Sequence, residues 1–323
     1  MAQLQRPGAP NPQQQKTFAS DRFGRRVIRD FKINRTIYLM LLPVLVYYII
    51  FQYGPMYGLQ IAFKNYIPSK GFTGSPWVGF DHFVAFFNSF YFWRLLGNTL
   101  LLSFYSLLFF FPAGIVLALL LNEIGNPRFK RTIQTITYMP HFISLVVIVG
   151  MMVDFLSTNG LINNLLGQIG IGPVPFMRDP GWFRTLFIGS DLWQNIGWSS
   201  IIFLAAISNI DPALYEASRI DGASRFRQAM HITFPGILPT VTILLILFIG
   251  RFMTVGAEKI LLMYNPVTYE TADVIQTYVY RKGILQADFS YSAAIGLFNA
   301  MISFTLLVLA NAIARRLGES RLW

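Results

Sequence analysis

Cysteine is absent from this chain of 323 residues, and charged side chains make up only 13% of it. The absence of cysteine excludes disulfides, thiolate metal sites and cysteine nucleophiles. The three histidines, His82, His141 and His231, form no metal-type pair at i, i+4 with a neighbouring glutamate. We therefore predict no metal site in this chain.

Two sequence patterns of catalytic proteins are also missing. No phosphate-binding loop of the G-x-x-x-x-G-K type occurs, so the chain is not expected to bind a nucleotide by that device. No serine lies between the two glycines that a nucleophile elbow requires. We predict no catalytic residues and no cofactor bound by the chain itself.

What the chain has in quantity is apolar residues, which make up 54% of it. Six segments have the length of about 20 mostly apolar residues that a bilayer span requires. They cover residues 37–57, 98–121, 135–155, 187–207, 237–255 and 291–314. The sequence therefore predicts an all-α polytopic membrane protein with six transmembrane helices.

The basic residues follow a membrane-topology pattern. Of the 26 Lys and Arg residues, 17 lie in the first 35 residues, the loop 122–132, the central loop and the C-terminus, and seven lie in the other three loops. The remaining two, Arg184 and Arg251, lie at or inside spans. The positive-inside rule then places both termini and the central loop in the cytoplasm. Because topology explains the net charge of +11, we predict no nucleic-acid binding.

The same pattern divides the chain into three parts. Residues 1–35 are predicted to form a cytoplasmic tail that ends in a basic interfacial helix, because basic and apolar residues alternate over residues 22–35. Residues 36–315 form the predicted transmembrane domain, and residues 316–323 form a cytoplasmic C-terminus.

A polar segment, residues 211–239, separates the fourth and fifth predicted spans. Asp211 followed by Pro212 predicts the start of a short helix, and Gly222 predicts its end. Ser224 predicts the cap of a second helix that ends at Pro235.

The first of these short helices has one small apolar face. Ala213, Ala217 and Ile220 recur at i, i+4 and i+7, while Glu216 and Arg219 are polar neighbours. Such a face suits a shallow groove on another protein.

Polar and aromatic residues in the predicted spans are the candidates for a substrate path. Trp193, Gln194, Asn195 and Trp198 form a stripe near the start of the fourth span. Aromatic faces beside amide groups suit sugar rings, but the same stripe is typical of an aromatic belt with interhelical hydrogen bonds.

Three further polar residues lie within the predicted spans. Arg251 is a cation deep in the fifth span, where it would pair with an acidic substrate or with a carboxylate of a neighbouring helix. Asn299 in the sixth span is a path candidate, although such a residue is also typical of helix packing. We expect His141 to cap a carbonyl that Pro140 leaves free.

The central segment carries a specific motif. It reads Glu216-Ala217-Ser218, three residues, Gly222, nine residues, Ile232, one residue, and Phe234-Pro235. This resembles the EAA loop of the permease subunits of binding-protein-dependent ABC importers, in which the pattern is Glu-Ala-Ala, Gly, Ile and Leu-Pro at the same spacing. Serine replaces the second alanine and is still small, and phenylalanine replaces leucine and is still apolar.

Residues around this motif and after the fifth span narrow the resemblance. The extended form, from Tyr215 to Ala223, resembles the carbohydrate branch of the family. Similarity to permeases for complex oligosaccharides, such as the alginate importer permease, extends over Tyr264-Asn265-Pro266, Tyr269-Glu270, Asp273-Val274-Ile275 and Tyr280-Arg281.

The resemblance implies a type I ABC importer permease core in a bacterial inner membrane, and not an enzyme. It implies that residues of the loop couple the chain to ATPase subunits: Tyr215, Glu216, Ala217, Ser218, Arg219, Asp221, Gly222, Ala223 and Pro235. Expected partners are a second homologous permease, two cytoplasmic ATPase subunits that bind ATP and Mg²⁺, an extracytoplasmic solute-binding protein, and a carbohydrate that is an oligosaccharide, with an acidic one such as alginate as an option.

Two other classes of protein were weighed. An ion-coupled secondary transporter of sugars would need a buried carboxylate relay and internal repeats, and the sequence shows neither clearly. An intramembrane enzyme would need an acid, base, nucleophile or metal set within the spans, and none is evident.

Overall fold

The computed structural model describes residues 30–316 and divides the chain into two compact units, Met1–Gln60 and Ile61–Trp323. The predicted N-terminal tail and most of the predicted interfacial helix lie outside the described residues. Among residues 30–316 the structure contains helices and one isolated bridge, between Lys64 and Trp77, but no strand. The predicted all-α fold is confirmed.

The first unit consists mainly of one long apolar helix. It runs through α3 (Arg35–Tyr48), a π turn (Ile49–Tyr53) and α4 (Gly54–Met56), and a 3₁₀ helix (Tyr57–Phe63) follows. The run Arg35–Phe63 has 29 residues, which is enough to cross a membrane. This agrees with the first predicted span.

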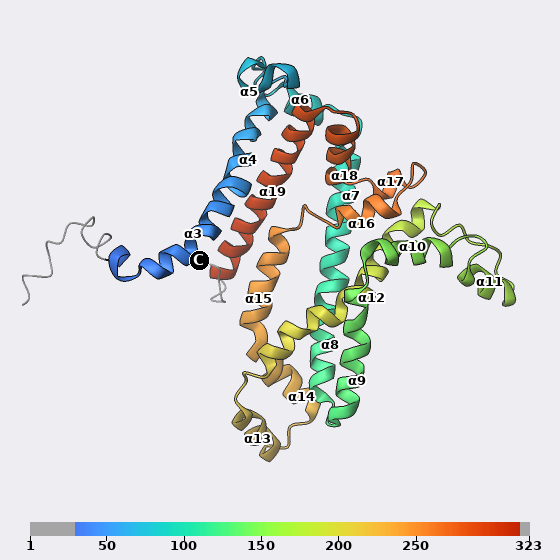
Figure 1. Cartoon of the computed structure of the whole chain (residues 1–323). Helices are drawn as coiled ribbons and strands as arrows, with labels where there is room; N and C mark the ends of the chain where they lie inside the picture. Colours follow the sequence, from blue (N-terminus) through green and yellow to red (C-terminus); the bar gives the residue numbers. More distant parts are fainter. Residues whose placement is uncertain (1–29, 317–323) are drawn as a thin grey trace, which may run out of the picture. The chain divides into compact units, whose positions relative to one another are not determined.

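The second unit begins with short elements at one end (Figure 1): a 3₁₀ turn (Pro68–Lys70), α5 (Gly71–Gly74) and α6 (Asp81–Phe87). A helix of 32 residues follows, Phe92–Glu123. It is made of α7 (Phe92–Tyr105), a π turn (Ser106–Phe110) and α8 (Phe111–Glu123). It forms the second predicted span.

The third predicted span is broken in the structure. Helix α9 (Pro127–Tyr138) passes through a 3₁₀ turn (Met139–Phe142) into α10 (Leu145–Phe155), with a bend of 95°. Pro140 lies in the turn, where it supplies no backbone N–H to continue the helix. The apolar run is therefore continuous in sequence but changes direction in space, and α11 (Leu161–Gln168) follows it.

Helix α12 (Pro180–Ile207) has 28 residues and contains the fourth predicted span. A bend of 77° separates it from α13 (Pro212–Ile220). The fifth span then runs without a break from Arg225 to Gly250. It comprises α14 (Arg225–Gln228), a π turn (Ala229–Thr233) and α15 (Phe234–Gly250).

The prediction that a helix ends at Pro235 is therefore wrong, and the π turns show why. Three of the four π turns among residues 30–316 end two residues before a proline, namely Pro55, Pro112 and Pro235. Proline removes a backbone donor and crowds the preceding turn. A wider π turn ahead of the ring relieves this crowding, so the helix continues.

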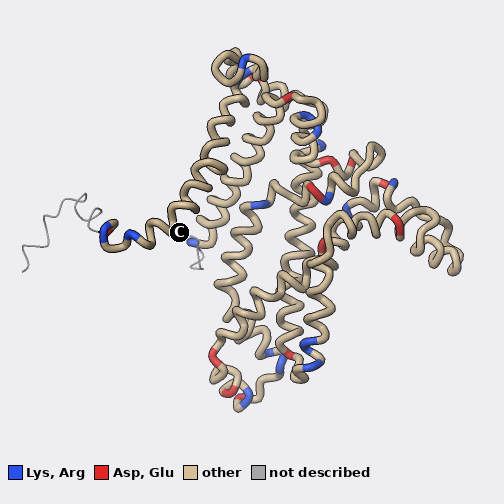
Figure 2. Tube along the Cα trace, viewed as in Figure 1, with Lys and Arg blue, Asp and Glu red and all other residues tan. Residues whose placement is uncertain are grey.

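The last part of the chain returns over the end that carries α5 and α6. It contains α16 (Ala257–Met263), α17 (Tyr269–Ala272), α18 (Ile275–Tyr280), a π turn (Arg281–Leu285) and α19 (Phe289–Arg316). Four helices in the described residues are long and apolar enough to cross a membrane, or six spans if each bent pair counts as one. Charged residues lie at the two ends of the second unit and also between them, around α10, α16 and α17 (Figure 2).

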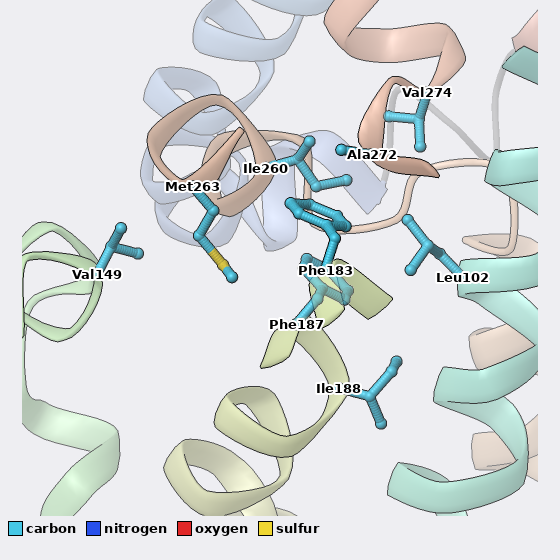
Figure 3. Close-up of a cluster of buried hydrophobic side chains, with 9 residues drawn as sticks. All are labelled: Leu102, Val149, Phe183, Phe187, Ile188, Ile260, Met263, Ala272 and Val274. Atoms are coloured by element: carbon cyan, nitrogen blue, oxygen red, sulfur yellow. The ribbon is translucent and has the colours of Figure 1, made fainter. Parts of the chain in front are cut away.

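Buried apolar side chains join these helices. One cluster gathers residues from α7, α10, α12, α16 and the chain around α17 (Figure 3). Its members are Leu102, Val149, Phe183, Phe187, Ile188, Ile260, Met263, Ala272 and Val274. A second cluster packs α8, α12 and α15 together nearer the opposite end, around Ile115, Phe203 and Ile237.

Helix α12 is the centre of this packing because two small residues let its neighbours approach closely. A Cβ at Gly197 would lie 2.1 Å from the carbonyl oxygen of Thr137 in α9. A Cβ at Gly114 in α8 would lie 2.4 Å from Oγ of Ser199 in α12. The backbone contact at Gly197 needs glycine, and small residues at close helix contacts are typical of membrane proteins.

Candidate functional site: a coupling segment and an intramembrane cavity

The polar segment 211–239 begins with a well-capped helix. Asp211 Oδ1 accepts a hydrogen bond from the Ala213 N–H at 2.9 Å, and Pro212 occupies the first turn of α13. The helix ends at Ile220, and Gly222 terminates it with a φ of +75°, in the left-handed region that favours glycine. The predicted start and end of this helix are confirmed.

Helix α13 is tied to the base of the fifth span by two of its side chains. The hydroxyls of Tyr215 and Thr233 lie 3.0 Å apart, and Gln228 donates a hydrogen bond to Ser218 Oγ at 3.0 Å. Ser224 Oγ accepts from the Arg227 N–H, as its predicted capping role requires. These contacts join α13 directly to the helix that continues into α15.

The other side of α13 is open. No residue of this helix is buried, and Ile220 is 88% exposed. The small apolar face that the sequence predicts, with Ala213 and Ala217, is exposed as well. Glu216 and Arg219 line a cavity of about 790 Å³ that reaches the end of α8. In Figure 1, α13 and α14 lie at the end of the second unit opposite to α5 and α6.

A second feature is a cavity of about 480 Å³ between α7, α8, α12 and α15, which we call the Arg251 cavity. Its polar lining includes Ser103, Ser106, Asp191, Ser199 and Arg251. Arg251 is exposed, and among residues 30–316 no carboxylate lies within 4.0 Å of its guanidinium. This cation has no counter-charge within the described chain.

The sequence predicts that Arg251 lies deep in the fifth span. In the structure it lies just after Gly250, the last residue of α15. The N–H and hydroxyl of Thr254 both donate to the Arg251 carbonyl, at 2.8 and 2.7 Å, and close a turn there. The apolar run continues through Met253 and Val255, so hydropathy does not reveal this end. The turn leaves the side chain free to face the cavity.

A chain of polar contacts adjoins this cavity, and we call it the polar chain. His141 Nδ1 lies 2.8 Å from Asn195 Oδ1, and Asn195 Nδ2 donates to Asp191 Oδ1 at 3.1 Å. Asp191 forms an ion pair with Lys259 of α16, with 3.7 Å between Nζ and Oδ1. The His141 ring also stacks on Trp198, with 4.4 Å between centroids. The prediction that His141 caps a backbone carbonyl is replaced by these side-chain contacts.

Lys259 is the member of the polar chain that sequence reasoning missed. Its side chain is 4% exposed, and Nζ donates to the Phe187 carbonyl at 3.0 Å. Helix α16 lies between the fifth and sixth spans. Burial lowers the pKa of Lys259 to about 8, although Asp191 favours the charged form. In the sequence, Lys259 is a lone lysine beside the apolar residues Ile260 and Met263, which belong to the core. Because the same pattern is typical of an exposed loop, it did not predict a buried cation.

The remaining predicted path residues separate in the structure. Trp193 and Trp198 are 49% and 47% exposed, whereas Gln194 is buried and donates to the Ile143 carbonyl at 3.2 Å. Asn299 does not meet the Arg251 cavity and lines another one. The structure thus brings Asn195 and Trp198 together through His141 but leaves Asn299 apart.

Comparison with known proteins identifies the family of this chain. Residues 110–319 match the family model described as the inner membrane component of binding-protein-dependent transport systems. The chain belongs to this family. It is thus a permease component of an ABC importer, not itself an enzyme.

Individual relatives of this permease are close. Protein LplB of Bacillus subtilis (strain 168) is 44% identical over 90% of this chain and 92% of its own length. The polygalacturonan/rhamnogalacturonan transport system permease protein YteP of the same strain is also 44% identical, over 93% of this chain and 94% of its own length.

The fold of the permease is similar to a solved structure as well. A chain from the bacterial alginate ABC transporter in complex with an alginate pentasaccharide-bound periplasmic protein matches with a TM-score of 0.86 and 45% identity. The match covers 92% of this chain and 100% of that one. The predicted type I importer permease fold is confirmed.

The residues after the fifth span that resemble oligosaccharide permeases hold this part of the chain in place. The Asp273 side chain is fully buried and forms an ion pair with Arg281, and Thr277 Oγ1 donates to its other oxygen at 2.8 Å. Asn98 Nδ2 donates to the Asp273 carbonyl at 3.0 Å and Asn98 Oδ1 accepts from Arg184 at 2.9 Å. These contacts clamp the segment that contains α17 and α18 onto α7 and α12.

Proposed function

We propose that this permease imports oligosaccharides that carry carboxylates, such as uronate-containing chains, at the expense of ATP hydrolysed by partner subunits. The permease YteP belongs to a polygalacturonan/rhamnogalacturonan transport system, and the solved alginate ABC transporter imports an acidic polysaccharide. The observation that carries the proposal is the charge balance of the Arg251 cavity. Lys259 neutralises Asp191, so the open guanidinium of Arg251 leaves the cavity with a net positive charge.

Aromatic residues of α12 suit the sugar rings of such a chain. Trp198 already stacks on His141, and nearly half of the surface of Trp193 and of Trp198 is open. Aromatic faces provide stacking area, and the hydroxyls of Ser103, Ser106 and Ser199 provide hydrogen bonds. We propose that Trp193, Asn195, Trp198 and Arg251 contribute to the substrate path.

The exposed helix α13 supports a coupling role for the segment 211–239. In this proposal its apolar face docks in a cleft of a cytoplasmic ATPase subunit, and Glu216 meets basic groups there. Movement of the ATPases would reach the fifth span through Tyr215 and Ser218 as a rigid-body displacement. The excess of basic residues in the first 35 residues, the loop 122–132, the central loop and the C-terminus favours a cytoplasmic location for both termini.

The proposed assembly contains this chain, a second homologous permease, two ATPase subunits and a solute-binding protein outside the membrane. ATP and Mg²⁺ would bind to the ATPase subunits. Specificity would then depend on both the binding protein and the path between the two permeases.

The substrate proposal is tested with the reconstituted complex in proteoliposomes. Arg251→Gln removes the charge and keeps a polar side chain, and Arg251→Lys is the matched control that keeps the charge. A charge-assisted hydrogen bond contributes about 1.5–3 kcal/mol, so uptake of oligogalacturonate or oligoalginate should fall by about 10- to 150-fold with glutamine. Neutral oligosaccharides should be affected little. Equal losses for acidic and neutral substrates would contradict a charge-selective role.

The coupling proposal has a separate test. Glu216→Lys reverses the charge of an exposed side chain that makes no hydrogen bond or ion pair within residues 30–316. The variant should fold normally but lose the stimulation of ATP hydrolysis by the loaded binding protein. Asp154→Lys is the control, because Asp154 is also exposed but lies in α10, outside the segment 211–239. Stimulation at the wild-type level with Glu216→Lys would refute the docking role of α13.

A further inference from the structure

The buried Lys259 is held against α12 by the way in which α16 begins. Gly256 precedes this helix with a φ of +38°, and a Cβ there would lie 2.6 Å from Cζ of Phe187. Because glycine has no Cβ, the chain packs directly on Phe187. Three residues later, Nζ of Lys259 donates to the Phe187 carbonyl at 3.0 Å and lies 4.9 Å from the centroid of the phenyl ring. These contacts fix the position of the ammonium beside α12.

The fixed ammonium in turn holds Asp191. Phe187 and Asp191 are four residues apart in α12, so they lie on the same face of that helix. Lys259 Nζ lies 3.7 Å from Asp191 Oδ1. Asn195, one turn further along α12, donates to the same oxygen at 3.1 Å. The Asp191 carboxylate is therefore held between Lys259 and Asn195.

This hold on Asp191 affects Arg251, because both side chains line the Arg251 cavity. Among the lining residues that the structure describes, Asp191 is the only acid and Arg251 the only base. Opposite charges that share a mostly apolar cavity attract each other more strongly than in water, and arginine pairs well with carboxylates. Yet the Arg251 guanidinium makes no hydrogen bond or ion pair among residues 30–316, whereas Asp191 is paired with Lys259.

We propose that Lys259 sets the charge selectivity of the permease by holding Asp191, so that Arg251 stays open to the carboxylate of a substrate. Without Lys259, Asp191 would pair with Arg251, and the cavity would contain an internal ion pair in place of a free cation. Lys259 is buried and does not line the cavity, so it acts through Asp191 as a positioning residue. The selectivity rests on the proposed import of acidic oligosaccharides, but the state of Arg251 can be measured without any substrate.

Three variants separate this role from a general effect on folding. Lys259→Met removes the charge and keeps an unbranched side chain that fits a buried site. The double variant Lys259→Met/Asp191→Asn also removes the carboxylate that would pair with Arg251. Lys282→Met is the matched control, because Lys282 lies in the π turn after α18, outside the Arg251 cavity, and forms no ion pair among residues 30–316.

The first measurement is the rate at which phenylglyoxal modifies Arg251 in the purified permease at pH 7, followed by mass analysis of the peptides. In Lys259→Met, Arg251 should react about tenfold more slowly, the factor that a weak charged hydrogen bond gives. The double variant and Lys282→Met should react at the wild-type rate. A wild-type rate in Lys259→Met would overturn the proposal. A slow rate in the double variant would also overturn it, because Asp191 would then not be what covers Arg251.

The second measurement is uptake of oligogalacturonate and of a neutral oligosaccharide by the reconstituted complex. Lys259→Met should reduce uptake of the acidic sugar by about tenfold or more, as Arg251→Gln does, and should affect the neutral sugar little. The double variant should return to within about twofold of the wild type. Equal losses for both sugars, or no rescue, would overturn the role of Lys259 in selectivity. If the wild type imports no oligogalacturonate, the proposed function fails, whereas the phenylglyoxal reaction still decides whether Lys259 keeps Arg251 open.

Discussion

The ion pair between Asp191 and Lys259 gives a quantitative prediction for Asp191→Asn. The two partners are unequally buried: the lysine side chain is 4% exposed and the aspartate side chain is 30% exposed. Asparagine keeps an oxygen that accepts from Asn195 but removes the charge that stabilises the Lys259 ammonium. The change should therefore destabilise the protein by leaving a buried cation without its partner.

The pKa of Lys259 limits the size of this effect. The buried ammonium already has a pKa of about 8, compared with its ordinary value of 10.5. Without Asp191 the side chain loses its proton instead of remaining charged, and deprotonation at pH 7 costs about 1.4 kcal/mol from a pKa of 8. Asp191→Asn should therefore lower the free energy of unfolding by at most about 1.4 kcal/mol at pH 7.

The effect should disappear as the pH rises. Between pH 8 and pH 10.5 the unfolded chain binds more protons at Lys259 than the folded chain, so the contribution of this lysine to stability increases with pH across that window. At pH 9 most Lys259 side chains are neutral even in the wild type, and the aspartate has little charge left to stabilise. Wild type and Asp191→Asn should then have nearly the same stability.

The assay is thermal unfolding of the purified permease in detergent, followed by intrinsic fluorescence at pH 7 and pH 9. Each kcal/mol corresponds to a shift of about 2–4 °C, so the variant should unfold a few degrees lower at pH 7 and at nearly the wild-type temperature at pH 9. Asp154→Asn, at an exposed acid with no ion pair among residues 30–316, is the control. An equal deficit at both pH values would refute the reasoning.

Two further predictions concern the packing of α9 against α12 and the buried ion pair between Asp273 and Arg281. Gly197→Ala should push α9 away from α12, because its Cβ would lie 2.1 Å from the Thr137 carbonyl oxygen, and should cost about 1–3 kcal/mol in thermal unfolding. Gly189→Ala in the same helix meets nothing within 4 Å and should be neutral or stabilising, so equal losses in both variants would contradict the packing argument. Arg281→Met should leave the fully buried Asp273 carboxylate without its cation and cost about 3–5 kcal/mol, and adding Asp273→Asn should recover much of that loss in the same measurement. Failure of this rescue would show that the ion pair is not the cause.

The coupling segment shows what local sequence predicts well. Asp211 with Pro212, and Gly222 with Ser224, each act through backbone geometry within a few residues. Such signals need no tertiary partner, and the structure has the expected caps. Pro235 failed as a stop signal because the π turn before it makes room for the proline ring, so that the helix continues.

The candidate path was less predictable because its contacts join residues far apart in the chain. His141 and Asn195 are 54 residues apart, and Lys259 lies beyond both. Hydropathy also gave no sign that α15 ends before Arg251, since apolar residues follow it.

The sequence by itself determined the membrane class, the six long apolar runs and the motif that identifies the family, because these depend on apolar run length, charge distribution and short-range spacing. The tertiary structure alone decided which polar residues meet. It paired Asp191 with Lys259, left Arg251 without a counter-charge among residues 30–316, and placed Asn299 in the lining of a different cavity. Helices of similar hydropathy pack in many rotations, and only their packing fixes which face each one turns toward its neighbours.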